Sequence, residues 1–196
     1  MKTNSKFLAF TYFAITGMLF TPSAFAHTFG AYDAGLAAGL AHPFIGLDHL
    51  LAMIAVGIWA GQLGGKSVWL VPLTFVSVMS AAAALGSFGI MLPMVEPAIA
   101  CSVLVLGLLI AGSIRLPAIA SVGLVGVFAV FHGYAHGLEL PQAASPILYG
   151  IGFVLATSLL HGLGIGFAQS SRQYKMIQRL AGCSLIVASG LLLAAA

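Results

Sequence analysis

Six apolar runs, each long enough to cross a bilayer as a helix, make up most of this chain and constrain its fold more than any other feature. Turn-forming residues separate the runs, which cover residues 44–63, 68–88, 92–113, 117–137, 144–168 and 176–195. Only 6% of the residues are charged, whereas a soluble domain carries about 25%. Such a chain cannot cover a water-facing surface, and its mean hydropathy is +1.11. We therefore predict an all-α integral membrane protein, a bundle of about six transmembrane helices.

The N-terminus has the pattern of a cleaved secretory signal. A basic start and an apolar stretch precede Ala24-Phe25-Ala26, which presents the small residues that signal peptidase accepts. We predict a signal peptide over residues 1–26 and a single helical-bundle domain over residues 27–196. Cleavage would place the mature N-terminus, His27, on the periplasmic side of a bacterial inner membrane. The apolar stretch 29–41 is too short to span and is expected to be an interfacial or re-entrant half-helix.

The basic residues test this orientation. With His27 outside, every Lys and Arg of the mature chain falls on the cytoplasmic side: Lys66, Arg115, Arg172, Lys175 and Arg179. Trp59 and Trp69 flank the first inner loop and are expected to be interfacial anchors. The formal charge is +3, but the basic residues do not cluster in the sequence. We therefore expect membrane lipid, and no nucleic acid, as a partner.

The same orientation places all four acidic residues, Asp33, Asp48, Glu96 and Glu139, toward the outer side. His132, His136 and Glu139 are spaced i, i+4 and i+7, so they share one helix face. Two imidazoles and a carboxylate suit a borderline divalent cation such as nickel, cobalt or zinc. Gly133 and Gly137 are four residues apart and would let a neighbouring helix pack closely beside this face.

The first predicted span carries a second group of ionisable residues. Pro43 suits the first turn of a helix, which would put His42 at its cap. His42 and His49 are seven residues apart and are expected to lie nearly on one face. Asp48 could ligate a metal or orient a histidine that does. His161 lies deeper, in the inner half of the fifth span, where it would suit an exit step.

Two segments resemble the signature motifs of the HupE/UreJ family, small nickel or cobalt permeases associated with hydrogenase and urease maturation. They are His42-Pro-Phe-Ile-Gly-Leu-Asp48-His49-Leu-Leu-Ala-Met53 and Phe131-His132-Gly-Tyr-Ala-His136-Gly-Leu-Glu139. The resemblance implies a functional set of His42, Asp48, His49, Glu96, His132, His136 and Glu139. It also implies that Ni²⁺ or Co²⁺ binds transiently as cargo, with no fixed cofactor and no catalysis. Facilitated diffusion, or movement driven by the membrane potential, is the expected mode.

Two other hypotheses stay open. Three histidines and an acid could hold catalytic zinc in an intramembrane hydrolase, although Ser102 has no evident histidine partner to make it a nucleophile. The protein could instead be a non-transporting partner in the assembly of a metalloenzyme.

Overall fold

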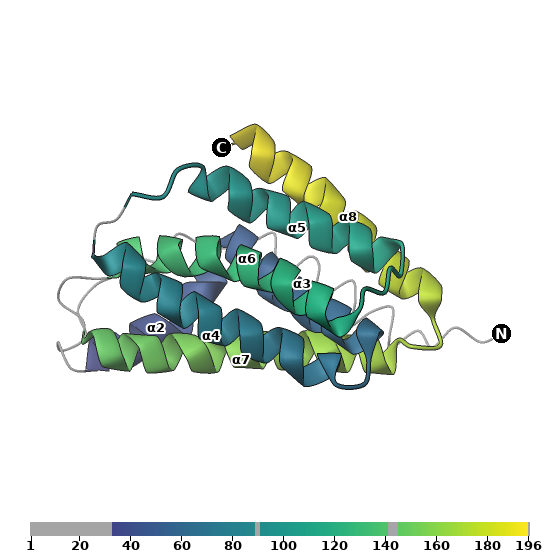
Figure 1. Cartoon of the computed structure of the whole chain (residues 1–196), viewed down its shortest axis with the longest axis horizontal. Helices are drawn as coiled ribbons and strands as arrows, with labels where there is room; N and C mark the ends of the chain where they lie inside the picture. Colours follow the sequence, from purple (N-terminus) through teal and green to yellow (C-terminus); the bar gives the residue numbers. More distant parts are fainter. Residues whose placement is uncertain (1–32, 89–90, 141–144, 196) are drawn as a thin grey trace.

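The computed structural model describes residues 33–88, 91–140 and 145–195, and every element in these ranges is an α-helix or a connecting segment (Figure 1). The prediction of an all-α fold is therefore confirmed for this part of the chain. The predicted signal peptide and His27 lie outside the described residues. The helices are α2 Asp33–Ile45, α3 Leu47–Leu63, α4 Ser67–Ser87, α5 Val95–Ala111, α6 Ala118–Leu138, α7 Pro146–Ser170 and α8 Lys175–Ala195.

The lengths of these helices define a multi-pass membrane protein. Four of the described helices, α4, α6, α7 and α8, are long and apolar enough to cross a membrane by themselves. The pair α2 and α3 forms a fifth candidate span that is bent by 83°. α5 is apolar but has 17 residues, which is at the lower limit for a span. Six spans result only if α5 is counted, so that number stays a prediction.

The predicted start of the first span is wrong. Pro43 and His42 were expected in the first turn and at the cap of that span, but α2 continues through both residues to Ile45. Pro43 has no N–H to donate to the preceding turn, so it weakens α2 near its end, and the chain bends at Gly46. His42 and His49 therefore lie on two differently directed helices and not on one helical face.

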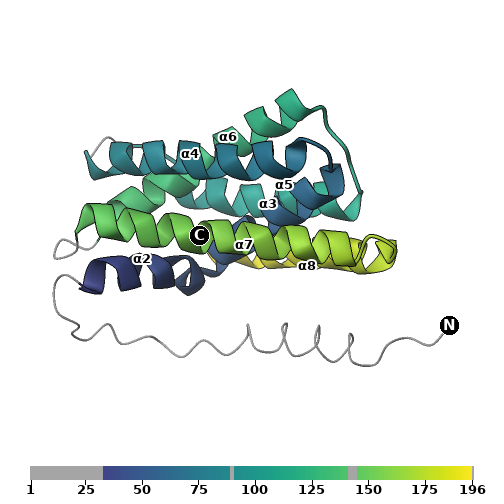
Figure 2. The ribbon, with the colours of Figure 1, turned by 90° about the horizontal axis from the view of Figure 1, so that it is seen from below.

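Three pairings of helices build the bundle. α4 packs along α6, α2 and α3 pack along α7, and α5 packs along α8 (Figures 1 and 2). A Cβ atom at Gly133 would collide with the carbonyl oxygen of Met79, and one at Gly137 with that of Ala83. The prediction that these two glycines admit a close neighbour is confirmed, and the neighbour is α4.

The helix ends separate acidic from basic residues. Asp48 lies in the first turn of α3, and Lys66 follows the last turn of that helix. Arg115 precedes α6, and Glu139 follows it. The bundle therefore has an acidic, histidine-bearing end and a basic end, as the sequence predicts.

One predicted interfacial anchor is wrong. Trp69 is 69% exposed, as an anchor requires, but Trp59 is fully buried. Its indole N–H donates a hydrogen bond to the carbonyl of Ile114 at 3.0 Å. The reason is that α3 packs against α4, α5 and α7, so its central residues are covered on several sides.

Candidate metal site

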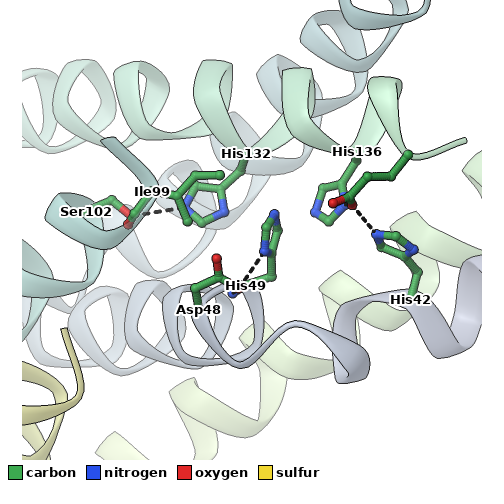
Figure 3. A network of polar contacts seen from close by, with 8 residues as sticks. His42, Asp48, His49, Ile99, Ser102, His132 and His136 are labelled. Atoms are coloured by element: carbon green, nitrogen blue, oxygen red, sulfur yellow. Dashed lines mark hydrogen bonds and ion pairs between the residues drawn. The ribbon is translucent and has the colours of Figure 1, made fainter. Parts of the chain in front are cut away.

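The C-terminal half of α6 supplies three of the predicted ligands. His132 and His136 are buried, whereas Glu139 follows the last turn and its side chain is 50% exposed. The i, i+4 spacing places the two imidazoles on the same helix face. Figure 3 shows both rings pointing from α6 toward His49 and His42. The α6 face that carries His132 and His136 is therefore directed at His42 and His49, the histidines of the second predicted group.

The bend between α2 and α3 positions His49. Asp48 Oδ1 accepts hydrogen bonds from the backbone N–H and from Nδ1–H of His49, each at 2.8 Å. Because an ionised carboxylate only accepts, Nδ1 carries the hydrogen and Nε2 keeps its lone pair. A Cβ atom at Gly46 would lie 3.0 Å from Asp48 Oδ1 and 3.1 Å from His49 Nδ1. The glycine at the bend thus leaves room for this pair.

His42, His136 and Glu139 form what we call the outer ligand group. One potential ligand atom from each of them lies within 4.8 Å of the other two. His42 Nε2 donates to Glu139 Oε2 at 2.9 Å, and His136 Nδ1 lies 3.8 Å from the same oxygen. The hydrogen bond from His42 lowers the pKa of Glu139, just beyond the end of α6, from its usual value. An ionised carboxylate therefore stands beside two imidazoles at the edge of the bundle.

His49, His132 and His136 form a second set, the inner histidine group. The ring centroids of His49 and His136 are 4.2 Å apart, and those of His49 and His132 are 5.0 Å apart. His49 Nε2, His132 Nδ1 and both ring nitrogens of His136 are buried without a hydrogen-bond partner. Buried polar atoms normally have partners, so nitrogens with free lone pairs that gather in one place fit metal ligands. His136 belongs to both groups and connects them.

Ser102 of α5 contacts the inner histidine group, and the expectation that it lacks a histidine partner is wrong. Its hydroxyl donates to the carbonyl of Ile99 at 2.7 Å, so Oγ accepts from Nε2–H of His132 at 2.9 Å (Figure 3). This hydrogen bond leaves the lone pair of His132 on Nδ1. No sequence signal points to the contact, because the two residues are 30 positions apart and lie on different helices.

Two members of the predicted set lie apart from these groups. Glu96 is exposed in the first turn of α5, and no hydrogen bond or ion pair joins it to a histidine in the described part of the chain. His161 is 2% exposed in α7, and both its ring nitrogens lack a partner. The ring of Phe75 contacts both His132 and His161, with centroid distances of 5.5 and 5.3 Å.

The fold and the site define a multi-pass helical membrane protein with a centre lined by histidines. Over residues 15–193 the chain matches the family described as HupE / UreJ protein, and it belongs to this family. It is 48% identical to Protein HupE of Rhizobium leguminosarum bv. viciae over 172 residues, which are 87% of this chain and 90% of that relative. The resemblance inferred from the two motifs is therefore confirmed. No solved structure matches the chain.

Proposed function

We propose that the protein is an inner-membrane permease that takes up a divalent transition metal, nickel or cobalt. The metal would pass through the outer ligand group and then the inner histidine group. The observation that carries the proposal is a continuous series of contacts between side chains. It runs from the half-exposed Glu139 through His136 and His49 to the fully buried His132. Imidazole and carboxylate ligands suit these borderline cations. Membership of the HupE/UreJ family supports a metal transport role linked to hydrogenase or urease.

The two groups suggest an order of events. A hydrated cation would first exchange water for Glu139 and the imidazoles of His42 and His136. His136 would then share the ion with His49 and His132, because its ring lies against that of His49. Each step exchanges one ligand for another of similar strength, so the ion is never held by a closed, permanent site.

Beyond His132 the proposed path meets an aromatic side chain. Phe75 is fully buried and contacts both His132 and His161. Passage from one histidine to the other would require its ring to move. His161 would then offer the last imidazole before the basic end of the bundle. Glu96 would act only by attracting cations to the outer end, since it is exposed and apart from both ligand groups.

Asp48 and Ser102 would hold the imidazoles in the correct tautomers. Each occupies one ring nitrogen, Nδ1 of His49 and Nε2 of His132, and so leaves the other nitrogen with its lone pair. Partners of this kind fix ligand orientation at metal sites in general. A variant that loses such a partner should keep the metal-binding histidine but bind metal less well.

Uptake of radioactive nickel or cobalt into liposomes that contain only this protein tests the proposal. We expect wild-type protein to accumulate metal at least about tenfold faster than His132→Ala. Ser189→Ala is a control for the loss of a buried polar side chain, because Ser189 is fully buried like His132 but has no histidine partner. Equal uptake by wild type, His132→Ala and empty liposomes would refute the proposal.

The same preparation separates the two other hypotheses. A zinc hydrolase should retain about one zinc per chain through purification, whereas a permease should lose its metal to a mild chelator. The Ser102–His132 contact resembles a nucleophile pair, but the hydroxyl hydrogen is directed at Ile99 and the side chain is fully buried. Uptake by the purified protein alone would exclude the hypothesis that this protein is only a non-transporting partner in the assembly of a metalloenzyme.

A further inference from the structure

The basic end of the bundle contains a cavity of about 870 Å³, and none of the residues of the proposed metal pathway lines it. Three connections meet around it: the turn between α3 and α4, the segment between α5 and α6, and the turn between α7 and α8. Its volume lies in the range of ligand-binding cavities in general, roughly 300–1,000 Å³. Residues that are distant in the sequence thus form one concave surface.

Four cationic side chains line this basic cavity: Arg115, Arg172, Lys175 and Arg179. No carboxylate is among its lining residues, and no salt bridge joins any of the four to an acid in the described part of the chain. The cavity also lies at the start of α8, where the helix dipole adds positive potential. A positive-inside bias explains charges on these loops, but it does not require them to surround one cavity.

The floor of the basic cavity is held in place by the amides of the buried Gln178 and the partly buried Gln62. Gln178 is 7% exposed, and its Nε2 donates to the carbonyl of Ala168 at 2.8 Å and to Ser171 Oγ at 3.2 Å. Its Oε1 accepts from Gln62 Nε2 at 3.0 Å. These bonds tie α3, α7 and α8 together beneath the cations. The cavity is therefore built on fixed elements and not only on mobile surface side chains.

We propose that the basic cavity binds the phosphate headgroup of an anionic membrane lipid. Guanidinium groups match phosphate oxygens in pairs, and three of the four cations are arginines. The cavity lies at the ends of apolar membrane-spanning helices, which is the level of the headgroups, and basic pockets between such helices bind anionic lipids. A divalent cation is excluded as its ligand, because four positive charges would repel it.

This proposal does not depend on metal transport. A lipid phosphate would neutralise part of the positive potential that any cation leaving the bundle must pass, but binding can be measured without transport. Since phosphate chemistry is shared by lipids and soluble anions, the experiment must separate these two sources.

The test uses the purified protein in a neutral detergent, with native mass spectrometry and thermal unfolding. Phosphatidylglycerol should remain bound and raise the melting temperature by several degrees, whereas phosphatidylcholine at the same concentration should not. Inorganic phosphate and glycerol phosphate should have much smaller effects, because they lack acyl chains that pack on the helices. An equal shift with inorganic phosphate would show a site for soluble anions and overturn the lipid proposal.

Arg172→Gln combined with Arg179→Gln should remove most of the shift caused by phosphatidylglycerol. Lys66→Gln is the matched control, since Lys66 lies at the same end of the bundle but does not line the cavity. If Lys66→Gln loses as much of the shift as the double variant, general surface charge is responsible and the proposal is wrong. If the double variant does not fold, the comparison of bound phosphatidylglycerol with phosphatidylcholine on the wild type still shows whether the protein selects an anionic lipid.

Discussion

At one end of the bundle three histidines are buried and His49 contacts the other two, whereas at the other end the ionisable side chains are exposed and surround a cavity. The histidine end presents buried imidazole nitrogens without hydrogen-bond partners, and the carboxylates of Asp48 and Glu139 lie beside the imidazoles. The exposed end presents only positive charges. The first arrangement is suited to coordination of a cation, and the second is suited to attraction of an anion. This difference gives the molecule a direction.

The two halves of α6 also differ in how closely the neighbouring helix α4 packs against them. Gly133, at the histidine end, has no room for a Cβ atom, whereas a Cβ at Gly126 would lie 3.7 Å from Thr74 Cγ2, an ordinary contact. Gly133→Ala should therefore lower the free energy of unfolding by about 3 kcal/mol, because α4 and α6 must move apart. Gly126→Ala should be neutral or stabilising by up to about 1 kcal/mol. Thermal unfolding in detergent measures both, and equal melting temperatures would show that the close packing is not specific to the histidine end.

Among the variants of residues proposed to orient a histidine, Asp48→Ala should lower metal affinity the most. The variant loses both hydrogen bonds that orient His49, and loss of such a partner costs about 10–100-fold in metal affinity. Asp48→Asn keeps an acceptor for the backbone N–H and should be less impaired. Nickel titrations of the purified variants measure the effect. Unchanged affinity in Asp48→Ala would mean that His49 needs no orientation.

The two outer acids distinguish ligation from attraction. Glu139→Gln removes the charge of the outer ligand group and should reduce uptake about tenfold at low metal concentration. Glu96→Gln removes the same charge from an exposed position without contact to a histidine, so uptake should fall by less than about twofold. Initial uptake rates in liposomes provide the measurement. A larger loss from Glu96→Gln would place Glu96 among the ligands, as the sequence resemblance implies.

Ser102→Ala should have the smallest effect of these changes. His132 would lose the partner on Nε2 and could place its hydrogen on either nitrogen, which should lower metal affinity by about threefold. Ser189→Ala removes a similar buried hydroxyl without touching a histidine and should leave affinity unchanged. If both serine variants lose affinity equally, Ser102 acts through packing and not through the tautomer of His132.

The sequence predicts the helices and the two ends well, because both follow from local patterns. Except at the first span, the apolar runs match the helices to within a few residues, and loop charges place Arg115 and Glu139 at opposite ends of α6. The spacing of His132 and His136 alone predicts their shared face.

What the sequence does not predict depends on contacts between distant segments. Pro43 is compatible with the first turn of one helix or the last turn of another, and only the packing of α2 on α7 decides between them. The contact between Ser102 and His132, and the cavity formed by three separate connections, arise only when the helices assemble. Local patterns carry no information about such neighbours.

X-ray absorption spectroscopy at the nickel edge reports the ligands of the bound ion, so it tests whether the histidines coordinate the metal. Wild-type protein loaded with nickel should show the outer-shell scattering of several imidazoles. His136→Ala removes the histidine shared by both ligand groups, so it should lose part of that scattering together with most of the bound metal. A wild-type spectrum with only oxygen ligands, or one unchanged in His136→Ala, would show that these histidines do not bind the metal.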